Sequence, residues 1–272
     1  MSKPLAIDLF CGLGGWTDGL LAEGYHARGY DIEAHEYGDE KYPGELVLQD
    51  VLTLHGSQFR DAALIVASPP CQEYSYMAMP WSRAKQIARA LRGKDTFPEG
   101  YTGSRTIAEL TALFDACFRI QREASAAAGR HIPLVVENVR GAVPWVGRAA
   151  WNYGSYYLWG DVPALMPHTL AALKTNGAPH VEQGRKHHGD WFNDPSSPSR
   201  QGGQSKPRDG VKGAGAGWFN DAKRDGGTET GYLSRTGSKS PARKAAAARI
   251  AKIPLPLSQW IARTYRPAQE AA

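Results

Sequence analysis

The run Leu5-Ala6-Ile7-Asp8-Leu9-Phe10, continued by Cys11-Gly12-Leu13-Gly14-Gly15, is an apolar segment that ends in a glycine-rich turn. A short apolar run with a single charge is typical of a strand buried on both faces. The glycines allow a tight turn, and they let a ligand approach the backbone at the start of the next helix, expected to run to about Glu23. A dinucleotide-binding fingerprint would carry a third glycine at position 17, where this chain has Thr17. The stretch predicts the first strand and helix of an α/β domain.

Two further apolar runs predict strands of the same sheet. Residues 62–67 are followed by Ser68-Pro69-Pro70, and residues 134–136 are followed by Glu137-Asn138. Between them, residues 106–128 place their apolar side chains on one helix face. Strands that alternate with helices imply a mainly parallel sheet with helices on both faces, whose ligands bind at the carboxyl ends of the strands.

The character of the chain changes after about Asp161. Glycine, proline, serine and basic residues dominate from Pro179 to Pro241, and helical and apolar patterning returns near residue 245. We therefore expect a catalytic and cofactor-binding domain at 1–160, completed by 243–272, and a loop-rich insertion at 161–242. The alternative for the insertion is a disordered linker.

Composition gives weaker constraints. Lys and Arg number 32 against 27 acidic residues in 272, a net charge of +5 that fits a nucleic-acid partner without requiring one. Three cysteines make neither a disulfide framework nor a paired zinc motif, so no metal is expected. The sequence shows no signal-peptide pattern and no run long enough to cross a bilayer. We expect a cytoplasmic monomer, in a prokaryotic or phage-infected host cell.

The most specific chemical signal is Ser68-Pro69-Pro70-Cys71-Gln72-Glu73-Tyr74-Ser75. It sets a thiol at the carboxyl end of a buried strand, and Glu137-Asn138-Val139 ends the neighbouring strand, so a carboxyl group is expected beside that thiol. A lone cysteine is more often a small buried hydrophobe. A thiol beside an acid at a ligand-binding sheet edge favours a nucleophile instead.

Two acidic residues follow shorter strand-like runs. Asp31 comes after Gly29-Tyr30, and Asp50 comes after residues 46–49. At the ends of the second and third strands, such carboxylates can hold ribose hydroxyls and accept from an adenine amine. The alternative for each is an ordinary surface carboxylate.

Together, residues 8–15, Pro69-Pro70-Cys71-Gln72 with Tyr74-Ser75, and Glu137-Asn138-Val139 resemble the motifs of the DNA cytosine-5 methyltransferase family, in the same order. The resemblance covers about residues 5–146 and, weakly, 253–265, and does not extend into the insertion. It implies a Rossmann-like methyltransferase domain, S-adenosylmethionine as cofactor, and double-stranded DNA as partner, read by the insertion.

The resemblance also implies a mechanism and a set of site residues. Cys71 would add to carbon 6 of a cytosine flipped out of the duplex, while Glu137 donates to ring nitrogen 3, and Asn138 is the third predicted catalytic residue. The predicted cofactor-binding residues are Asp8, Phe10, Gly12, Gly14, Gly15, Asp31, Ile32, Asp50, Val51, Pro70 and Lys252. The predicted substrate-binding residues are Ser68, Gln72, Ser75, Arg83, Arg140 and Arg148.

Two segments depart from the family pattern. The family usually carries a Gln-x-Arg-x-Arg strand after Glu-Asn-Val, but residues 151–159 are aromatic without arginine, so Arg140 or Arg148 is predicted to substitute. Lys252 stands near the place of the family's Gly-Asn pair. It is either a surface lysine or a partner for a negatively charged form of the cofactor, which would transfer a group other than plain methyl.

Basic residues are gathered in two other segments. Residues 74–104 are predicted to be a loop that closes over DNA, with phosphate contacts from its basic side chains; the alternative is a solvated helix face. These side chains are Arg83, Lys85, Arg89, Arg92 and Lys94. Loose candidates for reading DNA in the insertion are Arg185, Lys186, His187, His188, Arg200, Lys206 and Arg208.

Three other functions compete with the DNA methylase. The same chemistry on RNA cytosine uses the same catalytic residues. A non-catalytic DNA-binding relative would need neither Cys71 nor Glu137. A nicotinamide dehydrogenase leaves Pro70-Cys71-Gln72 unexplained and does not fit the glycine pattern.

Overall fold

The computed structural model describes residues 2–71, 74, 81–97, 107–166, 244–245, 248–249 and 251–268. The chain divides into two units, Met1–Pro167 with Ile253–Ala272, and His168–Lys252. Apart from residues 161–166, the predicted insertion lies outside the described residues. Its DNA-reading role, its candidate basic residues and the predicted domain boundaries therefore stay predictions.

The first unit is built on a seven-stranded sheet of order β3-β2-β1-β4-β5-β7-β6. The strands, in that order, are Glu45–Leu48, His26–Asp31, Leu5–Leu9, Ala62–Ala67, Leu134–Asn138, Tyr156–Gly160 and Trp151–Tyr153. All pairs from β3 to β5 are parallel, and β7 and β6 join them antiparallel. This confirms the predicted mainly parallel, Rossmann-like sheet. The chain order reverses between β1 and β4, the point at which such sheets bind ligands.

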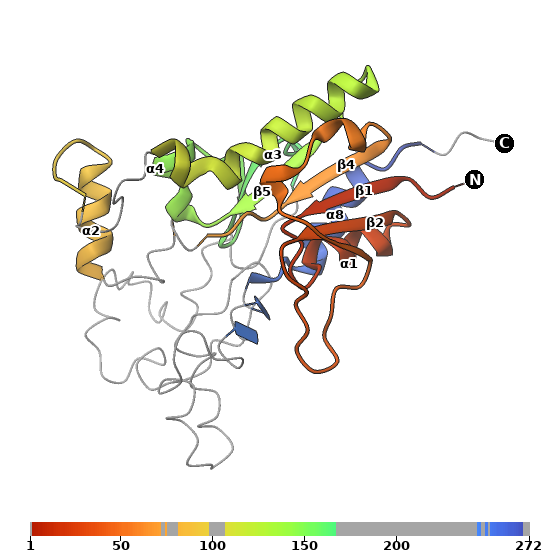
Figure 1. Cartoon of the computed structure of the whole chain (residues 1–272), viewed down its shortest axis with the longest axis horizontal. Helices are drawn as coiled ribbons and strands as arrows, with labels where there is room; N and C mark the ends of the chain where they lie inside the picture. The colour runs from red at the N-terminus through yellow and green to blue at the C-terminus, as the bar shows by residue number, and fades with distance from the viewer. Residues whose placement is uncertain are drawn as a thin grey trace, which may run out of the picture. The chain divides into compact units, whose positions relative to one another are not determined.

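Helices cover both faces of the sheet, as predicted. Helices α1 (Gly15–Ala22) and α8 (Leu255–Thr264) lie on one face and α3 (Ile107–Ala128) on the other (Figure 1). Successive residues of a strand point to opposite faces of the sheet. Val66 and Val135 belong to the hydrophobic cluster that includes Trp16 of α1. Their neighbours Ile65 and Val136 belong to the hydrophobic cluster that includes residues of α3. No helix among the described residues is long and apolar enough to cross a membrane.

Helices α1 and α8 make a close contact because glycines remove side chains from it. A Cβ at Gly15 would lie 2.3 Å from the backbone nitrogen of Ile253, and one at Gly19 would lie 2.4 Å from Ser258. The hydroxyl of Tyr25, buried just beyond α1, donates to the Ala262 carbonyl of α8 over 2.9 Å. The pair is therefore a fixed layer beneath the glycine turn.

One strand is longer than expected: β5 runs on through Glu137 and Asn138 instead of stopping before them. The aromatic, strand-like stretch 151–159 forms the antiparallel hairpin β6–β7. Residues 81–90, inside the predicted closing loop, form a helix, α2 (Trp81–Ala90), which was the alternative for this segment. Its Ala, Arg, Lys and Gln residues are strong helix formers, which explains the helix.

Candidate active site

The glycine turn after β1 is a tight left-handed bend. Phe10 adopts a positive φ of 57°, which is unusual for a non-glycine residue, and Gly12 follows with φ 50°. The amide of Gly14 donates to the Cys11 carbonyl over 2.7 Å, closing the turn. A Cβ placed on Gly12 would meet nothing within 4 Å. The backbone at Gly12 thus borders open space, where a ligand can approach it.

The other two predicted glycines serve packing instead. A Cβ at Gly14 would lie 2.4 Å from Cδ of Pro43, and Gly15 is filled by Ile253 in the same way. Both residues are buried. The space that a side chain would take at Gly14 and Gly15 is therefore occupied by the protein, and their predicted cofactor contact stays a prediction.

Asp8 lies below the turn rather than beside a ligand. It is 1% exposed, and its Oδ2 accepts a 2.8 Å hydrogen bond from the hydroxyl of Thr17. That hydroxyl also lies 2.6 Å from the hydroxyl of Tyr42. Oδ1 of Asp8 has no hydrogen-bond partner among the described residues, and burial raises the pKa of this carboxyl well above its usual range. The Asp8 carboxyl therefore supports the turn from within the fold, and its predicted contact with the cofactor stays a prediction.

Asp31, at the end of β2, is tied to the glycine turn. One carboxylate oxygen accepts from the amide of Gly12 over 3.0 Å, and the other accepts from the amide of Ile32 over 2.8 Å. His35 lies 3.6 Å from the carboxylate. Burial alone would raise the pKa of Asp31, but the hydrogen bonds from His35 and Gly12 outweigh it and hold that pKa below its usual value.

Exposed apolar side chains surround the two predicted acidic residues. Ile32, Leu48 and Leu52 are 73%, 58% and 46% exposed, an uncommon concentration at one sheet edge. Asp50 caps the short helix η1 (Val51–Thr53) by accepting from the amide of Leu52 over 2.9 Å. Val51 is 1% exposed and its side chain belongs to the core, and its predicted cofactor contact stays a prediction.

The turn that carries Cys71 is anchored on β1 and α1. The amide of Ser68 donates to the Leu9 carbonyl over 3.1 Å, and the indole of Trp16 donates to the Ser68 hydroxyl over 3.0 Å. Cys71 itself is partly exposed, and its carbonyl accepts from the amide of Tyr74 over 3.0 Å. Ser68, predicted to bind substrate, therefore connects the Cys71 turn to β1 through its amide and to α1 through its hydroxyl.

Asn138 joins the two catalytic motifs. Its side-chain amide donates to the Pro69 carbonyl over 2.9 Å, and its carbonyl oxygen accepts from the amide of Val139 over 2.8 Å. The residue is 1% exposed, and these two bonds hold the turn in place. They give Asn138 a positioning role, and its predicted part in catalysis stays a prediction.

Glu137 and Cys71 lie at the carboxyl ends of neighbouring parallel strands. Ala67 of β4 pairs with Val136 of β5, so Glu137 comes one residue and Cys71 four residues beyond that pair. Glu137 is 3% exposed. The structure thus brings the predicted nucleophile and acid to the same edge of the sheet, next to the point where strand order reverses.

Tyr74, three residues after Cys71, is held from three directions. Its hydroxyl donates to the Leu110 carbonyl of α3 over 3.0 Å. Its ring centroid lies 6.0 Å from that of Trp145, in helix α4 (Val143–Val146), and Phe97 lies 6.2 Å from the same ring. A Cβ at Gly141, in η4 (Arg140–Ala142), would lie 1.9 Å from the Tyr74 carbonyl oxygen. These contacts therefore hold the backbone in place at Tyr74, at the end of the catalytic turn.

The predicted substrate-binding arginines are placed differently. Arg140 is exposed in η4, and Arg148 is exposed just after Gly147, whose carbonyl accepts from the Trp159 indole over 3.1 Å. Trp159 lies on β7, the strand that pairs with β5 where the family's arginines were expected. In the place of the family's arginines, this chain thus has an aromatic strand, and its Trp159 holds the backbone of Gly147, next to Arg148.

Other predicted residues contribute less to the described site. Gln72 and Ser75 lie outside the described residues, and Arg83 is placed only by its backbone on α2. Pro70 is exposed beside Cys71. Lys252 is exposed and lies in the second unit. Of the basic residues around α2, Lys85, Arg89, Arg92 and Lys94 are exposed, and Arg89 pairs with Asp95 at 3.2 Å.

Sequence reasoning missed the residues that hold the site together. Trp16, Tyr42, Trp145 and Trp159 show only an apolar signal in the sequence, and their hydrogen bonds and ring contacts depend on tertiary placement. A hollow of about 540 Å³ within the β2–β3 connection contains none of the predicted catalytic residues. No three His, Cys, Asp or Glu side chains gather as a metal site in the described part of the chain.

Comparisons with solved structures give remote likenesses. A candidate DNA modification methyltransferase from an E. coli prophage is 21% identical, with 52% of this chain and 33% of that one covered and a TM-score of 0.33. The S. pombe Dnmt2 methyltransferase is 16% identical, with 52% and 36% covered and a TM-score of 0.30. The Entamoeba histolytica methyltransferase EhMeth is 17% identical, with 54% and 41% covered and a TM-score of 0.31.

The chain therefore spans between 33% and 41% of the length of these three structures. No curated protein matches it. A family model does match, that of the C-5 cytosine-specific DNA methylases, over residues 5–85. This range includes the glycine turn, Asp31, Asp50 and Cys71, and ends before Glu137. Residues 5–85 thus match the C-5 cytosine-specific DNA methylase family, which confirms over this range the resemblance seen in the motifs.

Proposed function

We propose that this protein transfers a methyl group from S-adenosylmethionine to carbon 5 of a cytosine in DNA. The observation that carries the proposal is the hydrogen bond from the Asn138 amide to the Pro69 carbonyl. It ties the Cys71 turn to the strand end that bears Glu137, so a thiol and a carboxyl group are presented together at one sheet edge. A binding protein has no use for that pairing.

The residues at the ends of β1, β2 and β3 fit S-adenosylmethionine. Gly12 borders open space in a turn at the start of α1, where the methionine moiety can approach the backbone. Asp31 lies beside it with a lowered pKa, as an acceptor for ribose hydroxyls requires. Ile32 offers an exposed apolar surface for the adenine ring, and Asp50 an acceptor for its amine. When bound, the cofactor supplies an electrophilic methyl group.

The chain's own residues then activate the cytosine. The Cys71 thiolate forms a bond to carbon 6, which breaks the aromaticity of the ring and makes carbon 5 nucleophilic. The Glu137 carboxylic acid donates its proton toward ring nitrogen 3 and stabilises the electron pair displaced there. Carbon 5 would then take the methyl group that the bound cofactor supplies, and the cofactor would leave as its thioether. Loss of the carbon 5 proton to a base, return of the nitrogen 3 proton to Glu137 and expulsion of Cys71 as its thiolate restore the ring.

DNA is the proposed substrate because exposed cations follow both catalytic motifs along the chain. Arg140 and Arg148 follow the Glu137 strand, and the basic residues of α2 follow the Cys71 turn. Such side chains suit phosphate contacts around a flipped base. We propose that the insertion 161–242 reads the sequence of the duplex.

The test is a mass analysis of nucleosides after the protein has acted on mixed-sequence DNA with S-adenosylmethionine. A deoxycytidine one methyl heavier is expected with the wild type and with Cys117→Ser, a buried thiol on α3, and not with Cys71→Ser. A product of another mass from protein purified from cells would point to a modified cofactor and to Lys252. Turnover on RNA alone, or on neither polymer, would overturn the proposed DNA methylation.

A further inference from the structure

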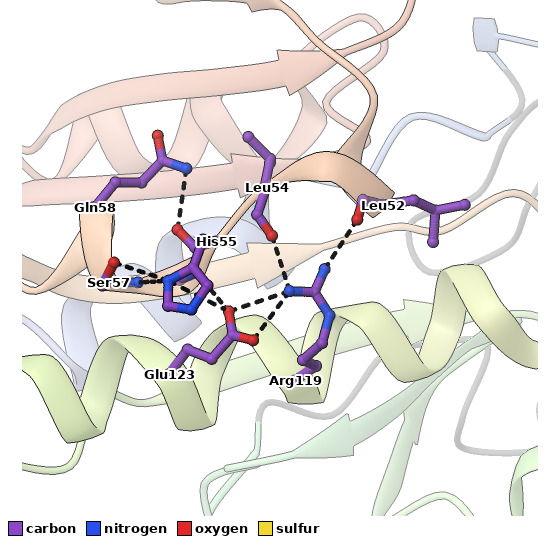
Figure 2. A network of polar contacts seen from close by, with 8 residues as sticks. Leu52, Leu54, His55, Ser57, Gln58, Arg119 and Glu123 are labelled. Atoms are coloured by element: carbon purple, nitrogen blue, oxygen red, sulfur yellow. Dashed lines mark hydrogen bonds and ion pairs between the residues drawn. The ribbon is translucent and has the colours of Figure 1, made fainter.

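The segment that carries Asp50 is fastened to α3 by a compact polar network. It contains η1 and a second short helix, η2 (Gly56–Phe59), between β3 and β4. Figure 2 shows Arg119 and Glu123 of α3 pointing at the backbone of this segment from below. The network lies outside the motifs from which the activity was proposed.

Arg119 holds two carbonyl groups at once. One guanidinium nitrogen donates to the Leu54 carbonyl over 2.8 Å, and the other donates to the Leu52 carbonyl over 3.2 Å. The amide of the same Leu52 donates to the Asp50 carboxylate over 2.9 Å. Arg119 is therefore connected to Asp50 through a single residue, because the Leu52 carbonyl accepts from Arg119 and the Leu52 amide donates to Asp50.

Glu123 orients the guanidinium and adds a second attachment. Both of its oxygens lie 3.1 Å from the same Arg119 nitrogen, and one of them accepts from the amide of Gly56 over 2.6 Å. A Cβ at Gly56 would lie 2.1 Å from the Ile120 carbonyl oxygen. The segment therefore lies directly against the backbone of α3, an approach that only glycine allows there.

His55 closes the network without adding a strong charge pair. Its Nδ1 accepts from the amide of Ser57 over 3.3 Å and so caps η2, while the Glu123 carboxylate lies 3.9 Å away (Figure 2). The fixed charges that hold the segment are thus those of Arg119 and Glu123.

We infer that Arg119 and Glu123 are positioning residues for cofactor binding, which act by fixing the Asp50 carboxylate that would accept from the adenine amine. This inference rests on the proposed function, since it assigns Asp50 to the cofactor's adenine. A guanidinium group that binds the carbonyls of residues 52 and 54 fixes both the position and the orientation of the η1 backbone. Asp50 can point its free carboxylate oxygen at a ligand only while η1 keeps that orientation.

A purely structural role makes a different prediction. An ion pair that only stabilises the fold lowers the unfolding temperature when broken, and leaves the affinity of the folded protein unchanged. A positioning role raises the dissociation constant and the KM for S-adenosylmethionine, and leaves kcat at saturating cofactor and the KM for DNA unaltered. The chain offers a matched control in Arg263, whose guanidinium pairs with Glu23 of the α1–α8 layer at 2.7 Å.

The experiment is a double-mutant cycle on the full chain, read by titration calorimetry with S-adenosylmethionine at a temperature where every variant is folded. Asp50→Ala is expected to weaken binding about tenfold, as for loss of one hydrogen bond to a charged acceptor. Arg119→Ala is expected to weaken it about fivefold. Because Arg119 acts through Asp50, the double variant should bind no more weakly than Asp50→Ala alone. Arg263→Ala should bind as the wild type does.

Glu123→Gln serves as the milder second variant, because it keeps an acceptor for the Gly56 amide while removing the charge that orients Arg119. It should weaken binding by about twofold to threefold. If the wild type binds S-adenosylmethionine and Arg119→Ala binds it equally well, or if the two losses multiply in the double variant, the inference is overturned alone. A wild type that binds no S-adenosylmethionine overturns the proposed function and the inference together.

Discussion

The side-chain amide of Asn138 donates to the carbonyl of Pro69 across 2.9 Å, between two residues that are both buried. The bond connects the end of β5 to the turn after β4. It is a direct link between the two catalytic motifs, and it explains why an asparagine follows Glu137. Proline has no amide hydrogen of its own, so the carbonyl of Pro69 is the backbone group through which that residue is attached to β5.

Loss of this amide should harm the active-site turn more than cofactor binding. Asn138→Ala leaves the Pro69 carbonyl buried without a donor, at a cost of about 1–3 kcal/mol in the free energy of unfolding. We expect a strongly lowered single-turnover rate with little change in the dissociation constant for S-adenosylmethionine. Asn152 is the control, since its amide donates to the Gly154 carbonyl at the surface over 3.0 Å. Asn152→Ala should change stability by less than about 0.5 kcal/mol.

The three thiols should differ sharply in reactivity. Cys11 and Cys117 are 6% and 0% exposed, and burial raises the pKa of both thiols, so they are neither accessible nor ionised near neutral pH. A disulfide reagent should modify one thiol rapidly in the folded protein and all three in denaturant. Cys71→Ser should remove the rapid phase, and a rapid phase that survives in that variant would contradict the placement of the catalytic turn.

Asp8 should make stability fall as pH rises. Burial raises its folded pKa above the usual value, so the protonated form is the one that the fold favours. The stabilisation is fully present below the unfolded pKa of about 4 and is lost as pH rises through the folded pKa. Asp8→Asn keeps an acceptor for Thr17 and removes the charge. The unfolding temperature of this variant, relative to that of the wild type, should therefore rise between about pH 4 and neutral pH.

The exposed carboxylate of Asp61 is the control for that measurement, with a side chain 82% exposed. Asp61→Asn should follow the wild-type pH profile. A constant difference between Asp8→Asn and the wild type across the range would mean that Asp8 stays ionised in the fold.

A comparison of alanine variants at Gly12 and Gly129 distinguishes an effect on ligand binding from an effect of backbone strain. Both have positive φ, 50° and 65°, and a Cβ at either would meet nothing within 4 Å. Alanine at each should cost about 1–2 kcal/mol in stability, because both must keep a left-handed conformation. Only Gly12→Ala should also weaken S-adenosylmethionine binding, as measured by calorimetry. Equal binding by the two variants would remove Gly12 from the cofactor site.

The sequence predicted the sheet better than the site. Apolar runs located β1 and β4 almost to the residue, and helical spacing located α3, because burial on two faces or one leaves a direct imprint on the order of residues. The helix at 81–90 was only the alternative for its segment, because the family resemblance favoured a loop over the residues' own helix propensity.

Within the site, the sequence identified the chemical groups but not their supports. Cys71 and Glu137 stand out because few residue types can do their chemistry. Asp8 was predicted to contact the cofactor and Asn138 to act in catalysis, because a polar residue in a motif does not show whether it is buried. Thr17, in the place of a third glycine, gave no hint that it would bind Asp8 and Tyr42, since those contacts exist only once three segments meet.

The packing of α8 on α1 imposes an order on folding. The hydrogen bond between Tyr25 and Ala262 spans 237 positions of the chain, and the ion pair between Glu23 and Arg263 spans 240. At ribosomal rates, about 10–50 seconds separate the synthesis of the two partners. Throughout that interval the apolar side of α1 has no cover from α8, including the surface at Gly15 and Gly19. The nascent glycine turn is therefore a candidate client for chaperones until α8 emerges.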